Sequence, residues 1–294
     1  MNAVAFAPSR LMVATADRSG MVKLWDIQTG HLLKTLVGHK TEVYSLAFSP
    51  DSRQVLSGDD RGEIRLWSVD GGQDMVPLPA LAGTIFTCSF SPNGQSILAS
   101  GYGTAYLWDI QQRRVVHEFK GYYDLVGSWF APDGESLFLS DGQGGYLHWI
   151  DTQTGHLRLK WDVTDAAVTA LACTKDNQTL YVWDTMKISV WELSTGKLIR
   201  MLADNSEYGD DRIEYVFKGV LAANETFLAA VGINGTVVTL DLSGSVIRRF
   251  EGHTDHLFAV ALSSDDQLLL TGSYDGTARL WDVQSGVELQ RFVP

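Results

Sequence analysis

The segment GHTDHLFAVALSSDDQLLLTGSYDGTARLWDV (residues 252–283) decides the fold, because its ending TARLWDV recurs along the whole chain. The related endings are MVKLWDI, EIRLWSV, TAYLWDI, GYLHWID, KISVWEL and VVTLDLS. Seven residues mark the same place in these endings: Trp25, Trp67, Trp108, Trp149, Trp191, Leu240 and Trp281. The steps between them are 42, 41, 41, 42, 49 and 41 residues, so one unit of about 42 residues is repeated seven times.

Each unit has the pattern of strands rather than helices. In the second unit VYSLAF alternates between apolar and polar residues, SPDS is a turn, QVLSG is apolar, DDRG is a second turn, and EIRLWSV alternates again. A period near 42 residues with four short strands is typical of one blade of a β-propeller. The sequence therefore predicts an all-β, seven-bladed β-propeller with four antiparallel strands per blade.

One blade cannot bury both of its faces alone, so we expect a single cooperative domain over residues 1–294. The predicted blades are residues 1–37, 38–79, 80–120, 121–161, 162–203, 204–251 and 252–294.

The seventh unit resembles the WD-repeat family through Gly252-His253, Ser273, Asp275 and Trp281-Asp282, and the resemblance covers essentially the whole chain. It implies a structural hydrogen-bond network of His253, Ser273, Asp275 and Trp281. We do not expect this His and Asp to act as a catalytic acid and base, because a saturated network leaves no lone pair for a substrate.

Other units depart from the family pattern. The second keeps Gly38-His39, whereas the fourth has Gly121-Tyr122. When the units are aligned on their Trp, Asp17, Asp59 and Asp141 fall two positions before the place of Asp275. We therefore expect no usual four-residue network in those units, and blades three, five and six should depend on packing.

Many relatives in this family share one blade between the two chain ends, but this chain is expected to differ. NAVAFAP at the start aligns with an innermost strand, and GVELQRFV at the end aligns with an outermost strand. Each blade should therefore be self-contained. The abrupt start also suggests the propeller portion of a longer protein with covalently linked flanking domains.

Composition limits the classes of partner. The net charge of −12 repels phosphate backbones and anionic headgroups, so we expect neither nucleic acid nor a membrane as partner. The first residues, MNAVAFAPSRL, lack the pattern of a secretory leader, no stretch of 18 apolar residues occurs, and Cys88 and Cys173 lack metal-ligand spacing. We expect a cytoplasmic protein without metal or cofactor; the oligomeric state is left open.

The resemblance implies that partners bind at the loops around the mouth of the central channel. The positions implied there are the second residue of each innermost strand and the residues of the tight turn between the second and third strands. Large aromatic and charged residues at these positions are candidates for partner binding, since aromatic side chains supply broad contact area and charged ones orient partners. They are Tyr44, Phe86, Phe217, Phe258, Tyr274, Arg18, Arg61 and Asp60. Packing of these aromatics in the channel mouth remains an alternative.

The 49-residue step marks an acidic insertion, LADNSEYGDDRIEY, which is an alternative partner contact. Its acidic side chains lack the regular spacing of a calcium loop.

These observations favour a non-catalytic scaffold or docking module that binds a protein or peptide. A small-ligand or peptide sensor using the channel is the alternative. We expect no enzymatic activity, because the seven histidines are scattered and no nucleophile elbow, phosphate loop or zinc-protease motif occurs.

Overall fold

The computed structural model describes the whole chain except residues 72, 73, 79, 123–126, 143, 144, 165, 205–215 and 294. Side chains at 74–77, 204, 216 and 217 also lie outside the described part. The chain divides into two compact units. The N-terminal unit is residues 2–167, and the C-terminal unit is Met1 with residues 168–294.

The N-terminal unit contains four antiparallel sheets, each formed by four consecutive strands. Its strands are β1 (Ala3–Phe6), β2 (Met12–Ala16), β3 (Val22–Asp26), β4 (Leu32–Leu36), β5 (Val43–Phe48), β6 (Gln54–Asp59), β7 (Ile64–Ser68), β8 (Asp74–Pro77), β9 (Ile85–Phe90), β10 (Ser96–Gly101), β11 (Thr104–Asp109), β12 (Arg114–Lys120), β13 (Gly127–Phe130), β14 (Ser136–Ser140), β15 (Tyr146–Asp151) and β16 (Leu157–Asp162).

The C-terminal unit contains three sheets of the same kind. Its elements are β17 (Val168–Cys173), β18 (Thr179–Asp184), β19 (Lys187–Glu192), β20 (Lys197–Asp204), β21 (Val216–Leu221), β22 (Phe227–Gly232), the 3₁₀ turn η1 (Ile233–Gly235), β23 (Val237–Asp241), β24 (Val246–Arg249), β25 (Leu257–Leu262), β26 (Leu268–Ser273), β27 (Ala278–Asp282) and β28 (Glu288–Phe292). Among the described residues no helix is long and apolar enough to cross a membrane.

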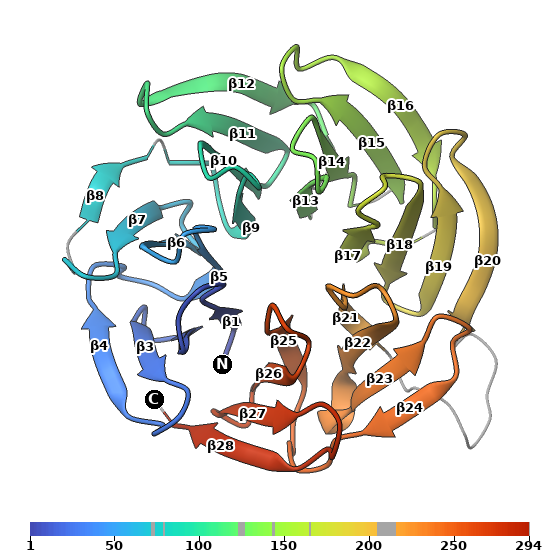
Figure 1. Ribbon diagram of the computed structural model, residues 1–294. Coiled ribbons are helices and arrows are strands. Elements are labelled where there is room, and N and C mark those ends of the chain that lie inside the picture. The colour runs from blue at the N-terminus through green and yellow to red at the C-terminus, as the bar shows by residue number, and fades with distance from the viewer. Residues whose placement is uncertain are drawn as a thin grey trace. The chain divides into compact units, whose positions relative to one another are not determined.

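The strand order confirms the predicted all-β, seven-bladed propeller with four strands per blade (Figure 1). We number the blades one to seven in chain order. Blade one is β1-β2-β3-β4 and blade seven is β25-β26-β27-β28, so each consists of four consecutive strands. The prediction that no strand is shared between the two ends of the chain is thereby confirmed.

Within each unit the first strands of successive blades lie side by side, β1 against β5 and β5 against β9, and likewise β17 against β21 (Figure 1). Second strands such as β14 and β22 are buried at every residue, because neighbouring sheets cover both of their faces. Fourth strands such as β4 and β16 are largely exposed or half-buried, with one buried residue each near the end of the strand. The long apolar runs in the sequence are thus second strands.

The core consists of side chains that interdigitate between neighbouring blades. In the N-terminal unit Leu24 of blade one shares a cluster with Val55 and Trp67 of blade two. In the C-terminal unit the fully buried Trp183 of blade five shares a cluster with Leu228 of blade six. This packing holds the strand ends, and the loops that join them, in fixed positions.

Candidate functional site

A β-bulge at the start of the first strand holds three of the expected aromatic residues. The ladder between β5 and β6 skips Tyr44, whose two neighbours pair with Asp59 and Gly58. Phe86 in blade three and Phe258 in blade seven are skipped in the same way. A bulge bends its strand and re-aims the extra side chain. These aromatics therefore occupy one structural position, which we call the bulge position.

The ladder of blade six also skips Phe217, but its side chain lies outside the described part of the structure. The same is true of the acidic insertion. Its residues beyond the described part include Glu207, Tyr208, Asp210, Asp211 and Glu214.

The turn after the second strand is tied to the loop before the first strand. The backbone N–H of Asp60 donates to the carbonyl oxygen of Glu42 at 3.0 Å, and that of Tyr274 donates to the carbonyl oxygen of His256 at 2.9 Å. Both sets of expected residues, those at the bulge and those in the turn, are thereby held at one end of the blade.

In blades one and two a charged cluster forms around Glu42. Its carboxylate lies 3.7 Å from the Nε of Arg18 and accepts a hydrogen bond of 2.8 Å from the Tyr44 hydroxyl. Glu42 was not among the residues expected from the sequence. Its opposite charge to Arg18 and its place two residues before the bulge are signals that could have found it. Arg18, Glu42 and Tyr44 are called the Glu42 cluster below.

Asp60 has a buried polar atom without a hydrogen bond within the described part of the chain. Its Oδ1 is buried and has no hydrogen-bond partner among the described residues. An unsatisfied buried oxygen costs about 1–3 kcal/mol. The neighbouring Arg61 is exposed, and its backbone N–H donates to the Asp59 carboxylate at 3.0 Å.

Phe86 contacts Tyr102, an exposed residue that follows β10. Their ring centroids are 5.0 Å apart at an interplanar angle of 74°, an edge-to-face contact, and Tyr102 is 51% exposed. Tyr102 stands where blade seven has Asp275 and was not among the expected binding residues. Blade three thus presents an aromatic pair where other blades use a polar turn.

In the C-terminal unit Phe258 and Tyr274 form a stacked pair. Their centroids are 4.1 Å apart and the rings are inclined by 29°. His256 lies 6.5 Å from Phe258, and its Nδ1 is 3.5 Å from the Asp255 carboxylate. Offset stacking of two aromatic rings makes a rigid apolar platform with polar groups at its edge.

The structural network of blade seven contains Thr271 in the place expected for Ser273. The Trp281 indole N–H donates to the Thr271 hydroxyl at 2.9 Å, and that hydroxyl lies 2.8 Å from Nε2 of His253. Nδ1 of His253 lies 2.7 Å from the Asp275 carboxylate. Ser273 instead donates its hydroxyl to the carbonyl oxygen of Asp255, because it lies one pleat nearer the turn.

The protonation states agree with this network. Burial lowers the pKa of His253, so its imidazole is neutral and uses both nitrogens. Burial acts to raise the pKa of Asp275, but hydrogen bonds from Thr277 and His253 outweigh it and hold the value at about 2. No ring nitrogen of His253 is left for a substrate.

Blade two forms the same network, contrary to the expectation drawn from its shifted aspartate. Nδ1 of His39 lies 3.0 Å from Asp59, its Nε2 lies 2.7 Å from the Ser57 hydroxyl, and Trp67 donates to that hydroxyl at 2.7 Å. Ser57 and Thr271 both stand ten residues before their Trp. A hydroxyl at that place, not the aspartate spacing, is the signal for the network.

Three ligand-type groups of blade two, from His39, Asp59 and Glu63, lie within 4.8 Å of one another. They do not fit a metal. Both ring nitrogens of His39 are engaged, and Glu63 pairs with the Arg65 guanidinium at 2.6 Å. The cluster is a hydrogen-bond network with a cation already beside it.

Blade four lacks the network. Tyr122 stands in the place of the histidine and packs edge-to-face on His148 at 4.7 Å. The indole nitrogen of Trp149 and Nε2 of His148 are buried without hydrogen-bond partners among the described residues. Burial, with a contribution from Lys160, lowers the pKa of His148 to about 4.

Comparison with known proteins agrees with this architecture. The family model described as "WD domain, G-beta repeat" matches residues 1–26, 30–68, 77–109 and 244–282. A guanine nucleotide-binding protein subunit beta of Saccharomyces cerevisiae (strain ATCC 204508 / S288c) is 24% identical, and the match covers 62% of this chain. The chain spans about half the length of this curated relative, 52%.

Proposed function

Because the chain is a seven-bladed propeller built from WD repeats, we propose that it is a non-catalytic scaffold that docks a protein or peptide at the bulge end of its blades. The observation that carries this proposal is the stacked pair Phe258–Tyr274, held by a bulge in one blade of the C-terminal unit. In the N-terminal unit the same bulge position holds Tyr44 and Phe86.

Aromatic residues on a rigid support favour docking, because they offer large contact areas with few rotatable bonds to immobilise. The charged groups beside them, the Glu42 cluster and Asp60, supply hydrogen-bonding groups that orient a partner. The saturated imidazoles of His39 and His253 support a non-catalytic role, since neither offers a lone pair to a substrate.

Affinity capture with the intact chain tests the docking proposal. The test variant is Phe258→Ala/Tyr274→Ala, which removes the stacked pair. The matched control is Leu198→Ala/Ile199→Ala, which removes two exposed apolar side chains from the outer strand β20. We expect partners held by the unmodified chain to be reduced about tenfold or more by the test variant and kept by the control.

Thermal unfolding of both variants separates loss of docking from loss of folding. If the test variant is folded and still captures the same partners in equal amounts, the bulge end of blade seven is not the docking site. Capture reduced equally in the β20 variant would place the contact on the outer strands instead. A synthetic peptide that competes for the same variant-sensitive capture would favour peptide sensing over docking of a folded partner.

A further inference from the structure

The turns between first and second strands carry a second feature of the molecule, at the blade ends opposite the bulges. Each of six such turns contains one residue with left-handed backbone. In four blades this residue bears a side chain, and in two it is glycine. The residues and φ angles are Ser52 (57°), Gly94 (69°), Gly134 (71°), Asn177 (54°), Glu225 (57°) and Asp266 (60°).

Where the left-handed residue has a side chain, that side chain can bond to the turn of the preceding blade. The Ser52 hydroxyl accepts the backbone N–H of Ser9 at 2.8 Å. The Asp266 carboxylate accepts the N–H groups of Ala223 and Asn224 at 2.7 and 2.8 Å. These side chains occupy the space between neighbouring blades.

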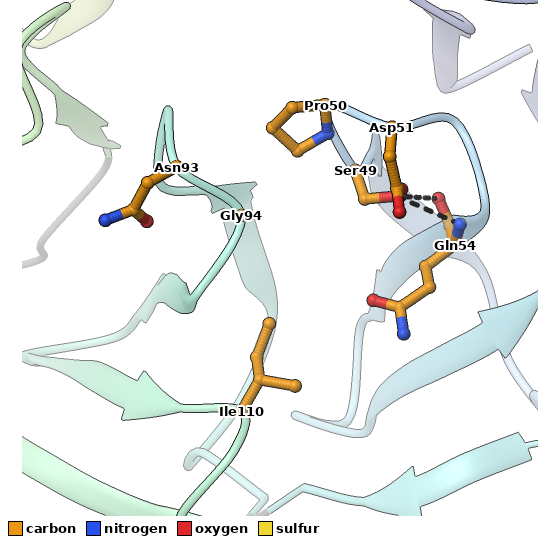
Figure 2. Close-up of a pocket in the computed structure, with 7 residues that line it drawn as sticks. All are labelled: Ser49, Pro50, Asp51, Gln54, Asn93, Gly94 and Ile110. Atoms are coloured by element: carbon orange, nitrogen blue, oxygen red, sulfur yellow. Dashed lines mark hydrogen bonds between the residues drawn. The ribbon is translucent and has the colours of Figure 1, made fainter.

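Gly94 leaves that space open between blades two and three. A cavity of about 280 Å³ is lined by Ser49, Pro50, Asp51, Gln54, Asn93, Gly94 and Ile110. Figure 2 shows the turn of blade two on one side, the turn of blade three on the other, and the Gln54 side chain directed towards Ile110. A Cβ at position 94 would lie 3.4 Å from the Pro50 ring.

The lining suits a cation with an aliphatic stem. It contains one carboxylate and two amides, with Pro50 and Ile110 as apolar surfaces and neither lysine nor arginine. Oδ1 of Asp51 accepts the Ser49 hydroxyl at 2.6 Å and the Arg53 backbone N–H at 3.0 Å. The Ser49 hydrogen bond lowers the pKa of Asp51, so the group is anionic at neutral pH. Within the described residues Asp51 forms no ion pair, although the charge of nearby Arg53 also lowers its pKa.

We propose that this cavity receives the side chain of a lysine or arginine from an extended segment of a partner protein. The charged head would meet the Asp51 carboxylate while the methylene stem lies along Pro50 and Ile110. The volume lies just under the roughly 300–1,000 Å³ of sites for drug-sized ligands, which suits one long side chain better than a cofactor. The net charge of −12 favours the approach of a basic segment.

The test is a titration of the ¹⁵N-labelled full chain with short capped peptides whose central residue is lysine, arginine or the neutral arginine analogue citrulline. Backbone amide shifts of Asn93 and Gly94 report occupation of the cavity. Asp51→Asn removes the charge and keeps an acceptor for Ser49. Gly94→Asn fills the cavity with a residue that tolerates left-handed backbone.

Matched controls exist in other blades. Asp265 accepts its own turn hydroxyl and N–H as Asp51 does, and a Cβ at Gly134 would lie 3.4 Å from the Pro92 ring, as at Gly94. We expect the lysine and arginine peptides to shift the amide signals of Asn93 and Gly94 in the unmodified chain and equally in the control variants Asp265→Asn and Gly134→Asn. In Asp51→Asn and Gly94→Asn the affinity for the lysine and arginine peptides should fall about tenfold, because about one charge-assisted hydrogen bond is lost.

Three outcomes would each overturn the proposal: equal shifts with the citrulline peptide, undiminished binding by Asp51→Asn, or no shift at about 10 mM peptide. A concentration of about 10 mM detects even weak, millimolar binding. Gly134→Asn carries the same backbone strain as Gly94→Asn, so a folding defect shared by both variants is due to strain. In that case the affinity of Asp51→Asn for the lysine and arginine peptides decides whether the cavity binds the cation.

Discussion

At the scale of single residues, hydroxyl groups decide which blades form the polar network. Thr271 and Ser57 each receive an indole N–H and contact a histidine ring nitrogen. Trp25 in blade one likewise donates to Thr15 at 2.8 Å, although that blade has no histidine partner. In blade four the corresponding residue is Leu139, and the Trp149 indole has no partner among the described residues.

Replacing Thr271 should therefore weaken blade seven more than replacing Ser273. Thr271→Val keeps the volume but leaves the Trp281 indole and His253 Nε2 buried without partners, at a cost of about 2–3 kcal/mol. Ser273→Ala loses the hydrogen bonds of this hydroxyl with the Asp255 carbonyl oxygen and the Asp275 backbone N–H, near the exposed turn, and should cost about 1 kcal/mol. Urea unfolding followed by tryptophan fluorescence measures both. A larger loss for Ser273→Ala would contradict the observed network.

His148 predicts a sensitivity to acid. Its pKa is about 4 in the folded protein, against 6.5 for a histidine in an unfolded chain, so unfolding takes up a proton between these values. Stability should fall as the pH drops from about 6.5 to about 4, by about 3 kcal/mol from this group. Burial lowers the pKa values of His39 and His253 in the same direction.

The variant His148→Gln cannot take up this proton. Its unfolding midpoint should depend less on pH between about 6.5 and about 4 than that of the unmodified chain. His31→Gln, which removes an exposed histidine instead of a buried one, is the matched control. An unchanged slope for His148→Gln would show that His148 does not titrate as the structure indicates.

At the scale of elements, the first strands of blades two, three, five, six and seven combine a bulge with close packing on their neighbours. In blade six Gly219 lies so near the fully buried Trp183 that a Cβ there would come within 2.2 Å of the indole nitrogen. β21 can approach β18 only because position 219 has no side chain. The bulge position two residues earlier depends on this register.

Gly219→Ala should therefore destabilise the C-terminal unit by about 3 kcal/mol, because an extra methyl group in a filled core forces neighbours to move. Gly71→Ala, on an exposed turn where the added Cβ meets only the Ser68 side chain at 3.0 Å, should cost about 1 kcal/mol or less. Differential scanning calorimetry compares the two. Equal losses of stability in the two variants would mean that the Trp183 side chain can move at little cost and that packing against it does not hold β21 in place.

At the scale of the whole molecule, charge selects the class of partner. The chain carries 35 acidic and 23 basic side chains, and its sequence isoelectric point is about 4.9. Its long-range field should repel polyanions at neutral pH and attract basic segments.

The intact protein should pass unretained through a heparin column at pH 7 in about 0.1 M salt, where charges interact over roughly 10 Å. At about pH 4, below the isoelectric point, it should be retained if it is still folded. Retention at pH 7 would reveal a basic patch that the net charge conceals and would reopen nucleic acid as a partner.

Much of the fold could be predicted because it depends on local repetition. The spacing of Trp25, Trp67 and their counterparts marks one strand per blade, and the alternation between them marks the others. The resemblance to WD repeats implied the second residue of each first strand as a binding position, but the bulge found there in several blades was not predicted. Glu42 and Tyr102 were not found, because each acts through a contact that forms on folding, Glu42 with Arg18 and Tyr102 with Phe86. Pairwise contacts of this kind leave no periodic signal.

The sequence by itself determined the number of blades, their strand order and the absence of a shared blade, because these follow from the period of apolar residues and turns within each unit. Only the tertiary structure decided that Thr271 rather than Ser273 completes the network, that Phe258 stacks on Tyr274, and that Gly94 leaves a cavity beside Asp51. These features depend on which side chains meet between strands and between neighbouring blades. Distances of a few ångströms decide them, and a repeat pattern does not encode such distances.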